Sequence, residues 1–67
     1  MNRAKALKAL AEKGMTQREV ADMIGISPAM FSKYMLNRNV MRVDMAIRTA
    51  GILGLTVEEL FGGEKDD

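Results

Sequence analysis

The fold is decided by one stretch, TQREVADMIGISPAMFSKY, which occupies residues 16–34. Thr16 and Glu19 have the spacing of a capping box, in which each side chain accepts a hydrogen bond from the other residue's backbone N–H. An apolar stripe at helical spacing follows, made of Val20, Ala21 and Ile24. Gly25 then supplies the positive φ that a sharp stop requires. These residues predict a short helix that ends in a tight turn at Gly25.

A second helix is predicted directly after this turn. Ser27 is a good N-cap residue, and Pro28 takes the first helical position, where its missing N–H costs nothing. The residues expected to face inward are Phe31, Tyr34 and Met35. The pattern over residues 16–36 therefore predicts two short helices joined by a tight turn. Such a unit can lay its second helix in the major groove of DNA.

Three more short helices are predicted around this unit. Residues 2–13 carry apolar positions at three- and four-residue spacing, which we expect to face the core: Ala4, Leu7, Leu10 and Ala11. Residues 43–53 carry a similar stripe: Val43, Ala46, Ile47, Ala50 and Leu53. Thr56 and Glu59 have the spacing of another capping box, which predicts a last helix over residues 57–61. With no strand-like alternation, the expected fold is all-α, a compact bundle of five short helices.

Two smaller expectations follow from residue types inside these helices. Gly51 disfavours the fourth helix by about 1 kcal/mol relative to Ala, which predicts either a close neighbour at that point or a bend. The methionines expected to fill gaps in the core are Met23, Met35 and Met45.

The composition excludes most catalytic and metal-binding sites. The 67 residues include no Cys and no His, so disulfides, thiolate metal sites and His-based catalytic pairs or triads are excluded. Ser27 and Ser32 have no base to activate them as nucleophiles. We therefore expect no enzyme, no metal and no cofactor. The longest uncharged apolar run is far below the roughly 20 residues that span a bilayer, and charged residues interrupt any signal peptide, which favours the cytoplasm.

Length and charge indicate one domain with a basic part and an acidic end. Residues 1–51 carry nine basic and four acidic side chains, whereas residues 52–67 carry one basic and five acidic side chains. A polyanionic partner is therefore expected to face the first three quarters of the chain, and a solvated surface with an acidic tail is the alternative. We expect the domain to span residues 1–63 and residues 64–67 to form a frayed acidic tail.

The chain also resembles a known family. The signature of the Cro/phage-repressor helix-turn-helix regulators, a xenobiotic-response-element-like family, is Thr-Gln, an apolar-Ala pair, apolar-Gly-apolar-Ser, an apolar residue with Ser, and an aromatic. The matching residues stand in register without a gap: Thr16-Gln17, Val20-Ala21, Ile24-Gly25-Ile26-Ser27, Phe31-Ser32 and Tyr34. Residues 52–61 resemble the segment that closes these domains, so the likeness covers about residues 3–61. It implies a lambda-repressor-like DNA-binding domain, with its helix-turn-helix at about residues 16–36.

Two departures from the family pattern concern the recognition helix, the second helix of this motif. After the aromatic residue, the family often has an acidic residue, a basic residue and Gly. Here those places hold Met35, Leu36 and Asn37, of which Asn tolerates the left-handed conformation. At the start of the helix, where the family often has Gln, Ser or Thr, stand Pro28, Ala29 and Met30. These three cannot make bidentate hydrogen bonds to bases, although Ala29 and Met30 suit thymine methyl groups.

The resemblance implies two sets of DNA contacts. Base readout is expected from the outer side of the recognition helix, by Lys33, Ser32, Ala29, Pro28 and Met30. Lys33 is the best reader, because lysine donates to guanine O6 and N7. Phosphate contacts are expected from Gln17, Arg18, Ser27, Asn37, Arg38, Asn39 and Arg42. The alternatives are that Lys33 is an ordinary surface lysine and that Arg18 only balances the charge of Asp22. The loop residues could likewise form only a polar connection between two helices.

The expected partner is double-stranded operator DNA. A dimer patch is expected near the C-terminus, as in the family, from Ile52, Val57, Leu60 and Phe61. The alternative is that these residues only close the core. The resemblance thus implies a phage- or mobile-element-type repressor or Cro protein. A homodimer would insert its third helix, about Pro28–Leu36, in the operator major groove and block transcription in the cytoplasm of a bacterial or phage-infected cell, at the nucleoid. No membrane and no small-molecule ligand are expected as partners.

Other functions remain open at this point. The apolar start of the recognition helix favours, as an alternative, a protein-interaction module or antitoxin-like partner-binding protein that keeps the fold with weak DNA binding. A third possibility is one domain of a longer repressor, against which the acidic stop after Gly62-Gly63 argues. The family also includes activators, so the resemblance leaves the sign of regulation open.

Overall fold

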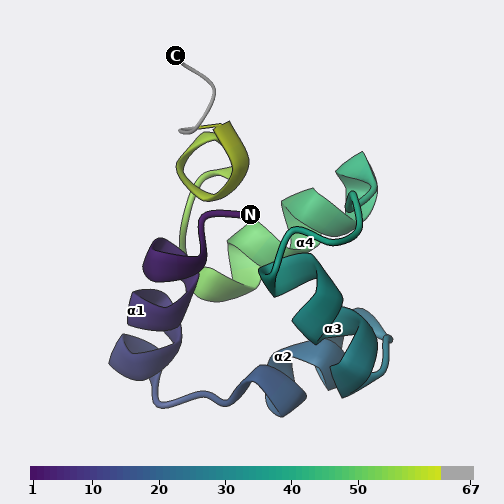
Figure 1. The fold of residues 1–67 in the computed structure, drawn as a ribbon. Helices are drawn as coiled ribbons and strands as arrows, with labels where there is room; N and C mark the ends of the chain where they lie inside the picture. Colours follow the sequence, from purple (N-terminus) through teal and green to yellow (C-terminus); the bar gives the residue numbers. More distant parts are fainter. Residues whose placement is uncertain (63–67) are drawn as a thin grey trace.

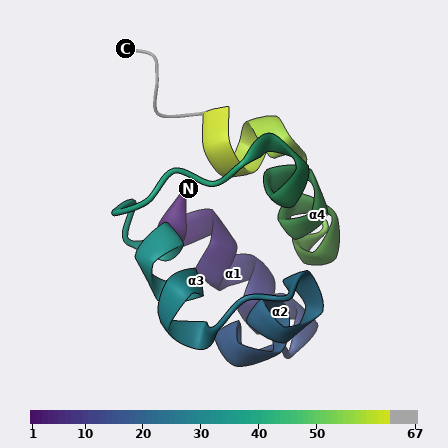
Figure 2. The same ribbon diagram turned by 90° about the vertical axis from the view of Figure 1, so that its right-hand side faces the viewer.

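The computed structural model describes residues 1–62, and these form a small all-helical domain (Figures 1 and 2). The helices run in the order α1 (Arg3–Lys13), α2 (Gln17–Ile24), α3 (Pro28–Met35), α4 (Val43–Leu53) and η1 (Glu58–Gly62). The expectation of an all-α bundle of five short helices is therefore confirmed. The acidic tail expected at residues 64–67 lies outside the described residues. In the described range, no helix is both long and apolar enough to span a bilayer.

Local hydrogen bonds place the helix starts where the sequence predicts them. Thr16 Oγ1 accepts from the Glu19 backbone N–H at 3.1 Å, and Glu19 Oε1 accepts from the Thr16 backbone N–H at 2.8 Å. Thr56 and Glu59 form the same pair of bonds, at 2.9 and 2.8 Å. Ser27 Oγ accepts from the Met30 backbone N–H at 3.1 Å. The predicted capping residues thus begin α2, α3 and the last turn, because caps depend only on residues three positions apart.

The turn between α2 and α3 is closed by the backbone alone. Gly25 has a φ of 81°, and the N–H of Ile26 donates to the carbonyl of Ala21 at 3.0 Å. A side chain at this position would be strained, since L-residues rarely adopt such a φ. Gly25 therefore reverses the chain within two residues and brings α3 against α2.

The core is built from the inner faces of all five helices. Val20, Ala21 and Ile24 of α2 are buried, as expected. Phe31 and Met35 of α3 are buried as well, and Tyr34 is half-buried against them. The remaining large apolar side chains buried in the core are Met1, Leu10, Leu53 and Leu60. The helix-turn-helix packs against α4 through α2, while α1 packs against α4 and η1 (Figure 2).

The inner face of α1 differs from the expected one. The exposed residues include Ala4, Leu7 and Ala11, whereas the buried ones are Ala6, Ala9 and Leu10. The prediction is therefore right for Leu10 and wrong for Ala4, Leu7 and Ala11, because apolar residues at helical spacing occur on both faces of this alanine-rich helix. Alanines at positions 6 and 9 let α1 approach α4 and η1 closely, and the Asn2 N–H donates to the Leu60 carbonyl at 2.6 Å.

The inner face of α4 is also rotated from the expected one. Val43 and Ile47 are 75 % and 57 % exposed, whereas Thr49 is fully buried. Burial of Thr49 is tolerated because its hydroxyl donates to the Met45 carbonyl at 2.8 Å. Ala46, Ala50 and Leu53 face inward as expected. Two branched apolar residues of the predicted stripe are therefore left on the surface.

Among the methionines, one expectation is wrong. Met35 is buried and Met45 packs against the core, as expected, but Met23 is 57 % exposed on α2. The α2 inner face is already filled by Val20, Ala21 and Ile24, so the neighbouring Met23 points to solvent.

Gly51 lies inside α4 without a close neighbour. The helix continues from Val43 to Leu53, and no atom outside that helix's own backbone lies within 4 Å of a Cβ built at Gly51. The close neighbour offered as one explanation of this glycine is therefore absent at that position.

We expect Gly51→Ala to stabilise the domain by about 0.5–1 kcal/mol, because Ala loses less backbone entropy in a helix. The melting temperature followed by circular dichroism should rise by about 2–8 °C for a domain of this size. Gly54→Ala is the matched control, since Gly54 has a φ of 72° and a Cβ there would meet Lys13 Cε at 3.2 Å. That control should lower the melting temperature, and a fall for Gly51→Ala as well would contradict the helical account.

The last capping box also predicts a pH dependence. The backbone N–H of Thr56 and then its hydroxyl, with a smaller effect of Lys5, hold the pKa of the Glu59 carboxyl below its ordinary value. A depressed pKa in the folded state stabilises the fold above the ordinary pKa, and this contribution is lost as pH falls through the folded pKa. Glu59→Gln keeps the hydrogen bond without the charge. The stability advantage of the natural chain over Glu59→Gln should therefore shrink between about pH 5 and pH 3. Chemical denaturation at each pH measures this advantage, and an advantage that stays constant over that range would contradict the role of the Glu59 charge.

Candidate nucleic-acid interface

One side of α3 is turned away from the core. Ala29, Ser32 and Lys33 are exposed, as is Pro28 at the start of the helix. Phe31 and Met35 are buried. At about 100° per residue, Ala29 and Lys33 lie about 160° around the helix axis from Phe31, whereas Pro28 lies only about 60° from it and is exposed at the start of the helix. The structure thus brings four of the five expected base readers onto the solvent side of α3.

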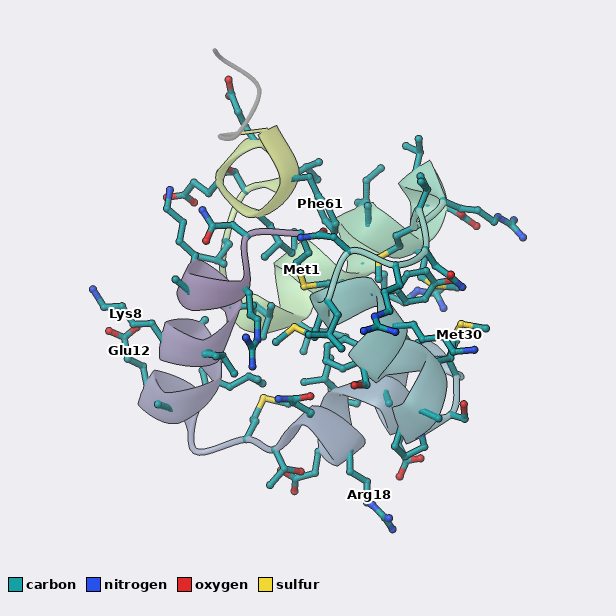
Figure 3. The ribbon with its side chains drawn as sticks, in the orientation of Figure 1. Met1, Lys8, Glu12, Arg18, Met30 and Phe61 are labelled. Atoms are coloured by element: carbon teal, nitrogen blue, oxygen red, sulfur yellow. The ribbon has the colours of Figure 1, made fainter. Side chains whose placement is uncertain are left out.

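The fifth expected base reader, Met30, is placed differently. It is half-buried, and its Sδ accepts a hydrogen bond from Asn39 Nδ2 at 3.4 Å. Met30 lies on the side of α3 away from α1 (Figure 3). Its side chain therefore connects the first turn of α3 to the loop that follows this helix.

Leu36, the residue that caps the C-terminal end of α3, is a further surface residue beside the expected base readers. Its N–H donates to the Ser32 carbonyl at 3.0 Å, so the helical path continues to this residue. Leu36 is 47 % exposed, although it is a large apolar side chain. The signal that identifies it is spacing, because Leu36 follows Ala29 by seven residues and Lys33 by three, which places all three on one face.

The N-terminal turn of α2 lies beside α3 and is open to solvent. Gln17 and Arg18 are both exposed, and Arg18 projects outward from α2 (Figure 3). Within residues 1–62 the one ion pair is between Arg42 and Asp44, so Arg18 is not paired with Asp22. Ser27 at the start of α3 is exposed too, with its hydroxyl engaged in the cap.

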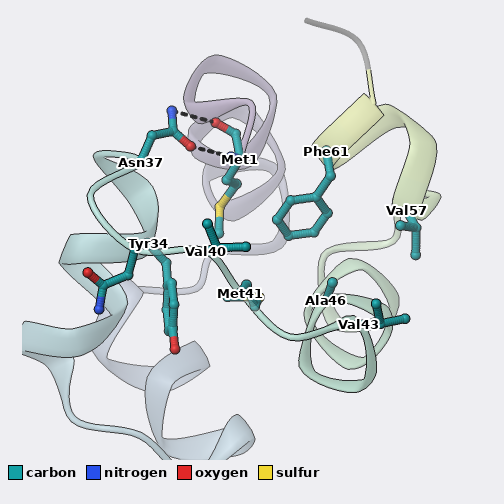
Figure 4. Close-up of a pocket in the computed structure, with 10 residues that line it drawn as sticks. Met1, Tyr34, Asn37, Val40, Met41, Val43, Ala46, Val57 and Phe61 are labelled. Atoms are coloured by element: carbon teal, nitrogen blue, oxygen red, sulfur yellow. Dashed lines mark hydrogen bonds between the residues drawn. The ribbon is translucent and has the colours of Figure 1, made fainter. Parts of the chain in front are cut away.

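The loop from residue 37 to residue 42 holds the other expected phosphate contacts. Asn37 adopts the left-handed conformation, with a φ of 59°, as expected of a glycine substitute. Its side chain is committed within the chain, because Oδ1 accepts from the Met1 amino group and Nδ2 donates to the Met1 carbonyl at 3.3 Å (Figure 4). The Asn37 side chain thus fastens Met1 to the loop.

The remaining loop residues differ in how free they are. Asn39 is exposed but donates to Met30, as described above. Arg42 Nη2 lies 3.2 Å from Asp44 Oδ2, and the two side chains are 79 % and 67 % exposed. Arg38 is exposed and makes no side-chain hydrogen bond or ion pair to any of residues 1–62. Arg38 is therefore the loop cation most available to a phosphate.

An apolar groove of about 440 Å³ lies beyond the C-terminal end of α3 (Figure 4). The loop, α4 and η1 form its walls, and Val40, Val43 and Val57 line it while remaining 94 %, 75 % and 39 % exposed. Of the expected dimer patch, Val57 is exposed, and Ile52 and Phe61 are half-buried. Leu60 is fully buried in the core, so its side chain is not presented to a partner.

Within the part of the chain that is described, the side chains form no cluster that could hold a metal ion. No three acidic side chains there lie close enough together to hold a metal ion. What the surface offers is an outward helix face with one cation, flanked by an exposed helix N-terminus and a basic loop. These features suit binding to a polyanion whose groove is wide enough to admit an α-helix.

Comparison with known proteins supports the same conclusion. A family model described as helix-turn-helix matches residues 7–60, which is most of the chain. No curated protein and no solved structure was found to match. The matched range begins within α1, contains α2, α3 and α4 completely, and ends at Leu60 of η1. The chain therefore belongs to the Cro/C1-type helix-turn-helix family and is a DNA-binding regulator of transcription.

Proposed function

We propose that this protein is a sequence-specific repressor of the phage or mobile-element type. Two copies bind an operator, insert α3 in the major groove of each half-site, and block access of RNA polymerase. The observation that carries the proposal is the outer face of α3, where Lys33 stands among small and apolar side chains opposite the buried Phe31. A regulator of this kind acts by occupying DNA and needs no cofactor. We place it with the bacterial nucleoid, in the cytoplasm of a bacterial or phage-infected cell.

The contacts to the DNA backbone come from both sides of α3 in this proposal. Gln17 and Arg18 are at the N-terminal turn of α2, where free backbone N–H groups and the helix dipole favour a phosphate. Arg38 supplies a free cation on the other side. Arg42 adds a second one, since its exposed pair with Asp44 contributes at most about 1 kcal/mol and is readily exchanged for a phosphate. Ser27 and Asn39 contribute exposed polar groups at the edge of the same surface.

The exposed apolar surface supports a homodimer. Val40, Val43 and Val57 at the groove continue into Ile47 on α4, which is 57 % exposed. Contiguous apolar surface of this kind is unusual on a monomer and marks sites of association. The longest dimension of the domain is 32 Å, close to the roughly 34 Å between half-sites one helical turn apart. Two copies joined through this surface would have to place their α3 helices at that spacing.

The same groove favours a second candidate function. An exposed apolar groove of about 440 Å³ is also what a protein-interaction module or an antitoxin-like protein uses to hold a partner. In that case DNA binding would be weak, and the groove would be the principal site. The experiments below separate the two functions.

The DNA-binding surface predicts two distinct mutant phenotypes. Binding through about five phosphates gives a slope of log K against log salt near −4 to −5. Arg38→Ala should weaken binding to all sequences alike and flatten the slope by about one, because it removes one phosphate contact. Lys33→Ala should instead change which sequence is preferred. Fluorescence anisotropy over a salt series, on sequences selected from random DNA, measures both effects.

A matched control for these variants is Lys8→Ala, because Lys8 lies on α1 at the far side of the domain from α3 (Figure 3). It should leave both the slope and the sequence preference unchanged. A flat salt slope in the natural chain, or no preference among sequences, would exclude the operator-binding function and favour the protein-interaction module.

A polar substitution in the proposed dimer surface should lower the average mass of the protein in solution. Ile47→Ser should shift the protein toward monomer and weaken binding to a two-half-site duplex more than to a single half-site, because it removes apolar surface from the interface. The side chain is 57 % exposed, so the fold should persist. Sedimentation velocity over a concentration series measures the association. Met23→Ser, at the same 57 % exposure on α2, is the control, and an equal effect of both variants would contradict this surface.

A further inference from the structure

We propose that the recognition helix reads thymine methyl groups on both sides of one guanine. Ala29 and Leu36 contact the C5-methyl groups of two thymines, and Lys33 between them binds the guanine. This inference rests on the proposed function, because it concerns the DNA sequence that the same surface of α3 selects.

Ala29 and Lys33 of α3 form one continuous stripe with Leu36, which caps the C-terminal end of that helix. At about 100° per residue, Ala29, Lys33 and Leu36 lie within about 60° of one another around the helix axis, and Ser32 lies beside them. All four side chains are exposed. Phe31 is fully buried on the opposite side, so this stripe takes no part in the core. The stripe is therefore apolar at both ends and cationic in its middle.

The major groove offers such a stripe only one apolar partner at the base edges. That partner is the C5-methyl group of thymine, since the other edge groups are hydrogen-bond donors or acceptors. The side chains of Ala29 and Leu36 have neither donors nor acceptors. Placed against adenine N6 or cytosine N4, they would remove water from a donor and leave it without a partner. Thymine is thus favoured both by apolar contact and by the penalty that the other bases incur.

Met30 is excluded from this stripe. It lies about 100° around the helix from Ala29, and its sulfur is 3.4 Å from Asn39 Nδ2. Its half-buried side chain is occupied with the loop and supports the shape of the surface rather than entering the groove. Leu36, which follows at helical spacing and is 47 % exposed, takes the place of the second methyl reader.

The helix geometry sets the spacing of the expected bases. Ala29 and Leu36 are seven residues apart, which corresponds to about 10 Å along the helix axis. This is about three base-pair steps for a helix that lies along the groove, at roughly 3.4 Å per step. The expected half-site therefore carries thymine methyl groups about three steps apart, on either strand, with a guanine between them.

The test removes single methyl groups from the DNA. A duplex bound by the natural chain is first selected from random sequence, and each thymine in it is then replaced by uracil, which lacks only the C5-methyl group. Affinity is measured at one fixed salt concentration. We expect binding to weaken about threefold to fivefold at each contacted thymine, as is typical for the loss of one buried methyl group.

Protein variants then assign each methyl group to a side chain. Leu36→Ala should abolish the effect of uracil at one thymine and leave the effect at the other, which identifies the pair in the manner of a double-mutant cycle. The matched control is Leu7→Ala, because Leu7 is an exposed leucine, at 38 %, on α1. It should leave both uracil effects unchanged. Circular dichroism of each variant checks that the helical fold is kept.

The possible outcomes separate this inference from the proposed function. A selection that enriches no sequence overturns operator binding itself, and methyl readout with it. An enriched sequence whose uracil derivatives all bind equally overturns methyl readout and leaves operator binding in place. A uracil effect that Leu36→Ala leaves unchanged overturns the role of Leu36.

Discussion

The packing of α2 against α3 across the Gly25 turn determines everything that the protein presents to DNA. Ala21 and Phe31 are both fully buried in the core shared by these helices. A larger side chain at Ala21 would force the two helices apart, at a cost of about 1–3 kcal/mol. Because Phe31 must point inward, Ala29, Lys33 and Leu36 must point outward. The recognition surface is therefore a consequence of how the core is filled.

The sequence predicted those features of the fold that depend on neighbouring residues. The two capping boxes, the Ser27 cap and the left-handed Asn37 could all be predicted, because each involves residues at most three positions apart or a single backbone conformation. The inner faces of α1 and α4 could not be predicted reliably. Which face is buried depends on the helices packed against it, and apolar spacing alone does not distinguish Leu7 from Ala6 or Ile47 from Thr49.

In the candidate site, the exposed positions could be predicted from the sequence, but the contacts between distant residues could not. The exposed positions on α3 follow from helical periodicity and from the resemblance to the family. The engagements of Asn37 with Met1 and of Met30 with Asn39 join residues that are 36 and 9 positions apart, so no local pattern indicates them. Leu36 was missed because an apolar residue near a helix end is usually assigned to the core. Only its exposure in the folded chain shows that it faces solvent.

The bond from the Asn2 N–H to the Leu60 carbonyl has a consequence for how the domain comes apart. A helix as short as η1 has little stability of its own in water, so it depends on its capping box, on the burial of Leu60 and on this connection to the first helix. Detaching η1 would uncover the small-residue face of α1 at the same moment. The start of α1 and the last helix therefore stabilise each other, while the rest of α1 remains packed against α4.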